Sequence, residues 1–379
     1  MDKIRGTNLG NWLVLEKWMS PELFEKSGTE DETWLARKTP PEEFAALLKR
    51  HRDTYVTEED FRQIAAFGLN AVRLPVPYHV FGDRPPMLGC VEYVDRAFDW
   101  AEKYNLKILL DLHTVPGSQN GYDNGGLTGV CKWCKNPADV EYALTVLERL
   151  AQRYGKRRGL FGIEVLNEPI SWIVYKTAPS TGKAVDKEEA RGSGYVPLSF
   201  LKPFYAEAYQ RLRKHMPEDK TVVFHDGFRL NRWNRFFTQA RMVNVALDTH
   251  IYIFAMEMFV PIARPWVYRA YIDINRRMLR KVEKAVPVIV GEWCISNKYS
   301  NDLNRDTADC EEIQRERYRR IARMQLKAWN QTHGWFYWNY QLLRDRNKPT
   351  DEVWKESWDL SRCFGNGWLD GEMLKTDVI

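Results

Sequence analysis

Two glutamates stand at the ends of apolar runs in this 379-residue chain. Glu168 closely follows the run Ile163–Leu166 and precedes Pro169, which cannot donate to a sheet ladder, so the expected strand stops there. Glu292 ends a second apolar run that begins at Pro287. Taken alone, each glutamate is most simply a solvated loop residue. Two strand-end carboxylates, however, predict a paired-carboxylate site, which is the equipment for cleaving a glycosidic bond.

The elements that must position these glutamates alternate between strands and helices. Eight strands are expected, at residues 5–9, 71–75, 107–112, 161–166, 221–225, 245–250, 288–292 and 334–338. Six helices are expected between them, at residues 57–67, 91–104, 137–154, 198–215, 267–286 and 310–329. This alternation predicts an α/β fold, a (β/α)8 TIM barrel that forms a single catalytic domain over residues 1–379. An open doubly wound sheet is the alternative, but no Gly-rich dinucleotide motif follows the first strand.

Several segments are too long to be simple connections. They span residues 16–52, 114–136, 170–197 and 340–368, and each follows a strand end. In a barrel, such loops lie on the face formed by the strand C-termini and wall a pocket there. The part at 180–194, which is rich in Gly, Lys and Glu, either belongs to this wall or forms a mobile surface insertion.

Polar side chains recur where the expected strands end. They are Asn8, Arg73, His113, Asn167, Asp226, His250, Tyr252 and Trp338. Singly, the arginine could be a buried ion-pair partner and the histidines could be satisfied core residues, because buried polar groups usually find structural partners. If the strands close into a barrel, these side chains converge on one opening together with the two glutamates.

Six motifs, at residues 5–16, 111–124, 166–169, 250–252, 291–293 and 334–338, together resemble glycoside hydrolase family 5. The likeness is nearest to its fungal exo-β-1,3-glucanases. The fourteen-residue run 111–124 is highly specific, whereas Asn-Glu-Pro at 167–169 is weak by itself. The resemblance implies a retaining β-glycosidase on a (β/α)8 barrel that acts on a β-linked oligosaccharide or polysaccharide.

The resemblance also implies residue roles. Glu168 would be the acid/base and Glu292 the nucleophile, Arg73 and Tyr252 would hydrogen-bond the nucleophile, and Asn167 would hold the sugar 2-hydroxyl. Seven more residues would bind sugar, namely Glu16, His113, Tyr122, Asp123, Asn124, His250 and Trp338. The residue chemistry agrees, since retention requires one ionised and one protonated carboxyl about 5–5.5 Å apart. An arginine beside Glu292 would favour its ionised form. No metal and no organic cofactor is called for.

This chain departs from the pattern at several positions. Asn11 and Trp18 stand where the glucanases usually have Gly and Tyr, and Tyr122 takes the place of one entrance phenylalanine. Phe254 is a candidate for the other, within a run, 253–259, that differs from the family. The subsite for the leaving group therefore resembles the family least. Another family-five activity (endo-β-1,4-glucanase, mannanase or glycolipid β-glycosidase) is the alternative, and a non-catalytic sugar-binding barrel is more remote because both glutamates are present.

Composition adds exclusions. The formal charge of +5 comes from 56 basic and 51 acidic side chains that are interspersed, so no nucleic-acid tract is expected. No apolar leader or membrane-spanning run is visible, which predicts a soluble and cytoplasmic chain as written, or a secreted one if a leader was removed. Cys131 and Cys134 lack a second pair to complete a metal site, and Cys294 is expected to be a small buried filler. The oligomeric state is left open.

Overall fold

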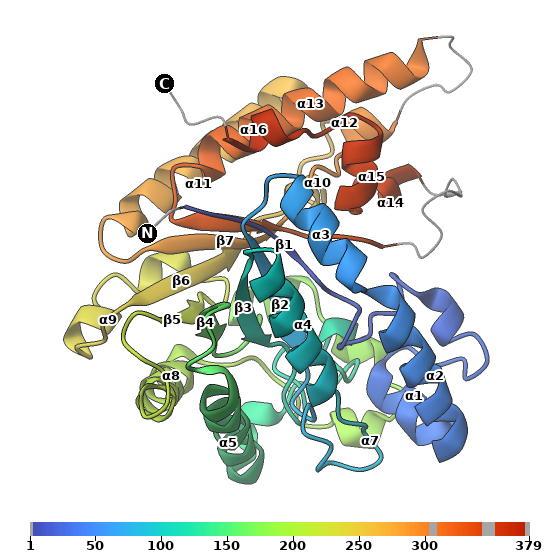
Figure 1. Ribbon diagram of the computed structural model, residues 1–379, viewed down its shortest axis with the longest axis vertical. Coiled ribbons are helices and arrows are strands. Elements are labelled where there is room, and N and C mark those ends of the chain that lie inside the picture. Colours follow the sequence, from blue (N-terminus) through green and yellow to red (C-terminus); the bar gives the residue numbers. More distant parts are fainter. Residues whose placement is uncertain (1–2, 303–308, 343–352, 376–379) are drawn as a thin grey trace. The chain divides into compact units, whose positions relative to one another are not determined.

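Eight parallel strands close into a barrel in chain order, which confirms the expected fold class. The computed structural model describes residues 3–302, 309–342 and 353–375 (Figure 1). The strands are β1 (Ile4–Asn8), β2 (Ala71–Val76), β3 (Lys107–Leu112), β4 (Leu160–Glu164), β5 (Thr221–His225), β6 (Val245–His250), β7 (Val288–Trp293) and β8 (Gly334–Tyr337). Their residues are almost entirely buried, as parallel strands covered on both faces require.

All six expected helices form. They are α3 (Glu58–Ala66), α4 (Val91–Lys103), α5 (Pro137–Tyr154), α8 (Leu198–Arg213), α11 (Pro265–Glu283) and α13 (Cys310–Trp329). The start of α5 follows from its sequence, because the Asn136 side chain accepts a hydrogen bond from the Ala138 N–H and Pro137 occupies the first turn. Its bounds therefore match the expected ones.

Further helices lie in the connections. The α-helices among them are α1 (Glu32–Lys38), α2 (Pro41–Tyr55), α6 (Trp172–Thr177), α7 (Lys187–Ala190), α9 (Phe236–Gln239), α10 (Ile253–Glu257), α12 (Lys298–Asn301), α14 (Val353–Glu356), α15 (Leu360–Gly365) and α16 (Gly371–Lys375). The 3-10 helices are η1 (Pro21–Leu23), η2 (Asp123–Gly125), η3 (Trp133–Lys135), η4 (Thr181–Lys183) and η5 (Leu230–Arg232).

Two compact units make up the chain. The first unit comprises Met1–Leu9, Arg62–Arg73 and Asp248–Ile379, and the second comprises Gly10–Phe61 and Leu74–Leu247. Both units contribute strands to the barrel. The single domain expected over residues 1–379 stays a prediction.

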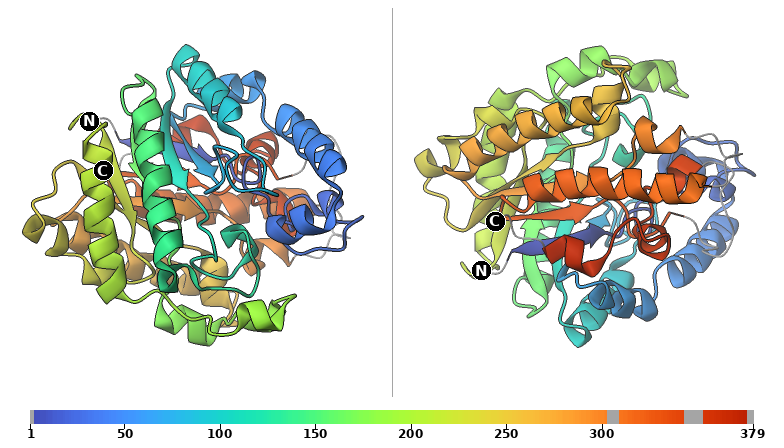
Figure 2. Two further views of the ribbon diagram at one scale, coloured as in Figure 1. Left: turned by 90° about the horizontal axis from the view of Figure 1, so that it is seen from below. Right: turned by 90° about the horizontal axis from the view of Figure 1, so that it is seen from above.

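In the first unit, β1 lies between β2 and β8, and β8 also pairs with β7. The register places Gly6 beside Ala71 and Ile4 beside Gly334. The long helices α11 and α13 lie side by side in this unit (Figures 1 and 2). This arrangement brings the carboxyl ends of β7 and β8 next to that of β1.

In the second unit, β4 pairs with both β3 and β5. Ile163 stands beside Leu110 on one side and Val222 on the other. Helices α5 and α8 run next to one another in this unit, as Figures 1 and 2 show. The end of β4, where Glu168 follows, is thereby held between two neighbouring strands.

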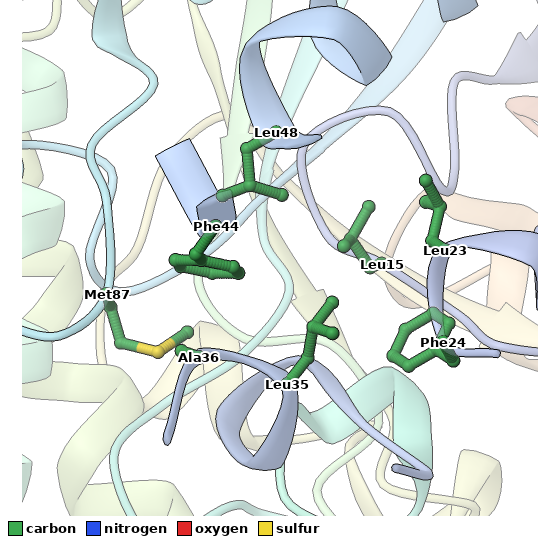
Figure 3. Close-up of a cluster of buried hydrophobic side chains, with 8 residues drawn as sticks. All are labelled: Leu15, Leu23, Phe24, Leu35, Ala36, Phe44, Leu48 and Met87. Atoms are coloured by element: carbon green, nitrogen blue, oxygen red, sulfur yellow. The ribbon is translucent and has the colours of Figure 1, made fainter. Parts of the chain in front are cut away.

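The expected loop 16–52 is more ordered than sequence analysis predicts, because it contains α1 and most of α2. A separate apolar cluster anchors it, formed by Leu15, Leu23, Phe24, Leu35, Ala36, Phe44, Leu48 and Met87 (Figure 3). Helix α1 begins where the Asp31 side chain accepts the Trp34 N–H, 2.8 Å away. The segment therefore folds as a small helical subdomain with its own core.

The segment 180–194 packs against the loop after β3. Ala184 and Ala190 share a buried cluster with Leu127 and Val130, and the Gly194 N–H donates to the Cys131 carbonyl over 2.9 Å. Its expected mobility stays a prediction. In the expected loop 340–368, residues 343–352 lie outside the described residues.

Candidate active site

Glu292 is a buried carboxylate surrounded by hydrogen-bond donors of the first unit. It lies in β7 and is 4% exposed. Arg73 Nη1 lies 3.0 Å from its Oε1, the Tyr252 hydroxyl donates to its Oε2 over 2.7 Å, and His250 Nδ1 is 3.3 Å from the same Oε2. A cationic guanidinium and a hydroxyl donor stabilise the ionised form of a buried carboxyl. Glu292 is thus equipped to act as an anion.

Arg73 is itself fixed by the strands around it. Its side chain is fully buried, and Nη1 also donates to Asn8 Oδ1 over 3.0 Å. The Asn8 amide in turn donates to the Gly291 carbonyl over 2.9 Å, and so ties β1 to β7. A buried charge is tolerated when paired and hydrogen-bonded in this way. The arrangement holds the guanidinium against Glu292.

Asp248 supports the site, and sequence analysis did not single it out. Its Oδ1 accepts the Gly291 N–H over 2.7 Å, while its Oδ2 lies 3.3 Å from His250 Nε2 and 3.9 Å from Arg73 Nε. The signal was present, because side chains alternate along a strand and Asp248 shares a face of β6 with His250. Asp248 orients both the histidine and the arginine.

We expect Gly291→Ala to destabilise the protein by about 1–3 kcal/mol, the usual range for overpacking a core. A Cβ at this position would lie 2.1 Å from Asp248 Oδ2, so the aspartate or the strand must shift. The change should appear as a lower midpoint of thermal unfolding. Gly182→Ala is the matched control, since a Cβ there meets nothing within 4 Å. Equal unfolding midpoints for the two variants would contradict the close packing of Gly291 against Asp248.

Aromatic rings flank Glu292 within the first unit. Tyr252 is fixed through its carbonyl, which accepts the Tyr271 hydroxyl over 3.1 Å. Its ring centroid lies 5.3 Å from Phe254 and 5.2 Å from Trp358. Trp338 is buried directly after β8, and its backbone N–H donates to the Trp293 carbonyl over 2.8 Å. The half-exposed Phe254 therefore belongs to an aromatic group beside the nucleophile candidate.

Glu168 lies just beyond β4 in the second unit. The strand ends at Glu164, earlier than expected, yet the Asn167 N–H still donates to the Leu112 carbonyl over 3.0 Å. Glu168 then adopts φ +43°, a left-handed conformation that is uncommon for a residue with a side chain. Its Oε2 accepts the Asn124 amide over 3.0 Å. Such outliers gather at functional sites, where the surrounding structure enforces them.

Asn167 and His113 form a connected pair in the second unit. His113 Nδ1 is 2.6 Å from Asp111 Oδ2, so Nδ1 is the natural donor and Nε2 the acceptor for the Asn167 amide, 3.4 Å away. The Gln119 amide donates to both the His113 and Asn167 carbonyls, over 2.8 and 2.9 Å. Asp111 and Gln119 thus orient the pair, and both lie inside the specific run 111–124.

The loop after β3 brings further expected residues near Glu168. The Tyr122 hydroxyl donates to the Ala178 carbonyl over 2.8 Å, and burial together with the charge of Glu168 raises the pKa of Tyr122 to about 12. Burial also raises the pKa of Asp123 above its ordinary value. Asn124 is oriented by the Asn120 amide, which donates to its Oδ1 over 3.0 Å. Tyr122 therefore stays a neutral hydroxyl at physiological pH.

Glu16 is buried in the second unit and held by two of the positions that depart from the family pattern. The Trp18 indole N–H donates to Glu16 Oε2 over 2.7 Å. Asn11 takes φ +63°, and its Oδ1 accepts the Glu16 N–H over 2.9 Å. Asn tolerates this left-handed conformation better than most residues. The side chains of Asn11 and Trp18 thus support Glu16.

The site residues fall into two groups by unit. The first unit holds Arg73, His250, Tyr252, Glu292 and Trp338, and the second holds Glu16, His113, Tyr122, Asp123, Asn124, Asn167 and Glu168. Asp226 instead stabilises a turn, because its Oδ1 accepts the Phe228 N–H over 2.6 Å. Each group presents a carboxylate with its own hydrogen-bond partners.

The cysteines are free thiols. Cys294 is fully buried beyond β7, where desolvation raises its pKa well above the ordinary value. A buried thiol that resists ionisation is a poor nucleophile, in agreement with a filler role. Among the described residues, the helices include none that is long and apolar enough to cross a membrane.

The chain is similar to known glycoside hydrolases over most of its length. The family model described as Cellulase (glycosyl hydrolase family 5) matches residues 38–341. A probable glucan 1,3-beta-glucosidase A of Emericella nidulans is 34% identical over 97% of this chain and 89% of its own length. A glucan 1,3-beta-glucosidase of Schwanniomyces occidentalis is 32% identical over 89% of this chain and 83% of its own. The fold is similar to that in the crystal structure of rutinosidase from Aspergillus niger. The two superpose over 97% of each chain with a TM-score of 0.74, at 22% sequence identity.

Proposed function

Because the chain belongs to glycosyl hydrolase family 5, we propose that it is a retaining exo-β-1,3-glucosidase that uses Glu292 as nucleophile and Glu168 as acid/base. The observation that supports this most is the environment of Glu292, a buried carboxylate that accepts hydrogen bonds from Arg73 and Tyr252 and has His250 Nδ1 3.3 Å away. The preference for β-1,3-glucans rests on the names of the two fungal relatives.

In the first step, Glu292 attacks the anomeric carbon as an anion. A bond forms between its carboxylate oxygen and that carbon while the glycosidic bond breaks. Arg73 and Tyr252 hold the carboxylate in place, and their hydrogen bonds weaken as the carboxylate loses its negative charge in forming the ester bond. The leaving oxygen takes the proton of Glu168, because a sugar alkoxide is too basic to leave unassisted.

In the second step, water attacks the glycosyl-enzyme. Glu168, now ionised, accepts a proton from the water, whose oxygen bonds to the anomeric carbon and releases Glu292. The Asn124 amide donates to Oε2 of Glu168 and so orients the carboxyl for proton transfer. One side chain therefore serves as acid and then as base.

Asn167 and His113 are suited to hold the sugar in the first subsite. The Asp111–His113–Asn167 chain of contacts fixes both side chains before the substrate arrives. Preorganised groups of this kind lower the entropy cost of positioning a substrate. In this proposal, Asn167 contacts the 2-hydroxyl, while Glu16, Asp123 and Asn124 contact other hydroxyls and Trp338 forms the floor.

The proposal requires the two carboxyls to face each other. A closed parallel barrel opens at the carboxyl ends of its strands, and the proposal takes both carboxyls to line that opening. Retaining chemistry further requires a separation of about 5–5.5 Å between the carboxyls. A crystal structure with a bound sugar would measure this distance directly.

We expect laminaripentaose to release glucose as the first small product, in the β configuration. Exo action removes one terminal sugar at a time, and two displacements at the anomeric carbon restore its configuration. Product sizing with proton NMR early in the digest measures both properties. Parallel digests of cello-, gentio- and manno-oligosaccharides serve as linkage controls. Early α-glucose, mixed oligomers, or faster cleavage of another linkage would contradict the retaining, exo or β-1,3 part respectively.

A further inference from the structure

A cavity outside the proposed catalytic groups lies in the second unit. Its volume is about 730 Å³, within the range of small-molecule sites. The lining comes from three separate parts of the chain: the segment 171–173 after β4, Leu198 and Lys202 of α8, and residues of the segment 229–235 after β5. We call it the basic pocket. The pocket is large enough for a sugar or a ligand of similar size.

The basic pocket has a strongly one-sided charge. Lys202, Arg229, Arg232 and Arg235 line it, and its lining includes no Asp or Glu. Within the part of the chain that the structure describes, none of these four cations forms an ion pair with a carboxylate. Arg211, on the same helix as Lys202, instead pairs with two glutamates at 2.6 and 2.8 Å. The four cations thus leave a positive field that favours an anionic ligand.

Arg229 shows the same preference at the level of single atoms. Its Nη1 donates to the Val196 carbonyl over 2.9 Å. Its Nε and Nη2 are buried and have no hydrogen-bond partner among the described residues. Unsatisfied buried donors are costly, and a guanidinium matches the two oxygens of a carboxylate or sulfate. Arg229 also lines the pocket, so an anion bound there would lie beside a guanidinium whose hydrogen-bonding capacity is not filled.

An exposed aromatic ring stands at the same pocket. Trp172 is 55% exposed although it lines the cavity. The Ser171 side chain accepts the Val174 N–H over 3.2 Å and so fixes the start of α6, where Trp172 lies. Flat aromatic faces stack on the apolar faces of sugar rings. A tryptophan beside cations that form no ion pair fits a sugar that bears a negative charge.

The place of Trp172 in the chain indicates which part of a substrate would reach it. It follows shortly after Glu168, the proposed acid/base, and the acid/base acts on the leaving group. We propose that the basic pocket is a subsite for the leaving-group part of the substrate and selects sugars that carry a carboxylate or sulfate group. This inference rests on the proposed function and extends it to a class of acidic glycosides.

The test measures binding of three thio-linked disaccharides, whose sulfur bridge resists hydrolysis. Each has a β-1,3-linked glucosyl unit, and the second sugar is glucose, glucuronate or glucose 6-sulfate. By calorimetry at low salt, we expect the charged probes to bind at least about tenfold more tightly than the neutral one. The advantage should shrink in 0.5 M salt, because ions screen the attraction. Comparison of the two charged probes tells a carboxylate preference from a sulfate preference.

The Arg232→Gln/Arg235→Gln double variant should lose most of this advantage. Both arginines are largely solvent-exposed, so their removal should leave the fold intact. The matched control is Arg269→Gln/Arg280→Gln, which removes the same charge from exposed positions of α11. It should keep the full advantage.

Three results would overturn the inference. They are equal affinity for neutral and charged probes, an advantage that the pocket variant retains, and inorganic sulfate that binds as tightly as the sugar probes. The proposed function fails separately, if the unaltered protein does not hydrolyse the oxygen-linked neutral disaccharide. Hydrolysis without an anion preference would reject the basic pocket alone, whereas an anion preference without hydrolysis would reject the proposed function alone.

Discussion

Glu292→Ala should reduce turnover of 2,4-dinitrophenyl β-glucoside on the order of 10⁵-fold, as expected when a covalent nucleophile is removed. The alanine methyl cannot form the glycosyl-enzyme, and this substrate has a leaving group that needs no acid. Steady-state kinetics on the purified variant measures the loss. Addition of azide should restore turnover, because the small anion enters the space of the lost carboxylate, and the product should be the α-glucosyl azide.

The control must show that the fold survives. Removing Glu292 leaves Arg73 with Asn8 Oδ1 at 3.0 Å and Asp248 at 3.9 Å, so its charge keeps polar partners. Glu257→Ala is a matched change, because Glu257 is also a buried carboxylate of the first unit and accepts the Tyr268 hydroxyl over 2.6 Å. It should retain activity. If the Glu292→Ala variant turned over substrate at a rate within tenfold of the unaltered protein, Glu292 would not be the nucleophile.

The barrel was predictable because its strands are buried on both faces. Such strands read as continuous apolar runs, as in Lys107–Leu112 and Val288–Trp293, and amphipathic helices separate them. Helices α1 and α2 were missed because length and position alone made 16–52 a loop. The residues that mark their starts, Asp31 and Pro41, were present in the sequence. Their apolar residues, however, pack in a separate cluster, so these helices do not follow the strand–helix alternation of the barrel.

The strand-end side chains could be predicted, whereas their supporting contacts could not. Position in sequence assigns Glu292 to the end of a strand, but only the fold shows that Asp248 contacts Gly291, His250 and Arg73 at once. The left-handed backbone of Glu168 has no sequence signal either. The basic pocket escaped prediction for a similar reason. Its cations come from separate segments, and each looks like a solvated surface residue when met alone.

Glu168→Ala should separate substrates by their leaving groups. We expect cleavage of laminaribiose to fall by about 10³–10⁴-fold, near the upper end for loss of general acid catalysis. The first step with 2,4-dinitrophenyl β-glucoside should stay nearly unchanged, because dinitrophenolate leaves without a proton. The second step still lacks its base, so rapid mixing should show a burst of dinitrophenolate followed by slow release. Stopped-flow absorbance measures both phases.

The chemistry also distinguishes this variant from the loss of Glu292. Azide should accelerate the slow phase by attacking the glycosyl-enzyme from the side of the missing acid/base, and the product should be the β-glucosyl azide. Alanine meets the same φ of +43° as glutamate, so backbone strain is matched. Glu188→Ala, an exposed change in the same unit, should leave both substrates unaffected. An equal loss of activity on both substrates, or an α-glucosyl azide product, would show that Glu168 does not protonate the leaving group. The roles proposed for Glu168 and Glu292 would then have to be exchanged.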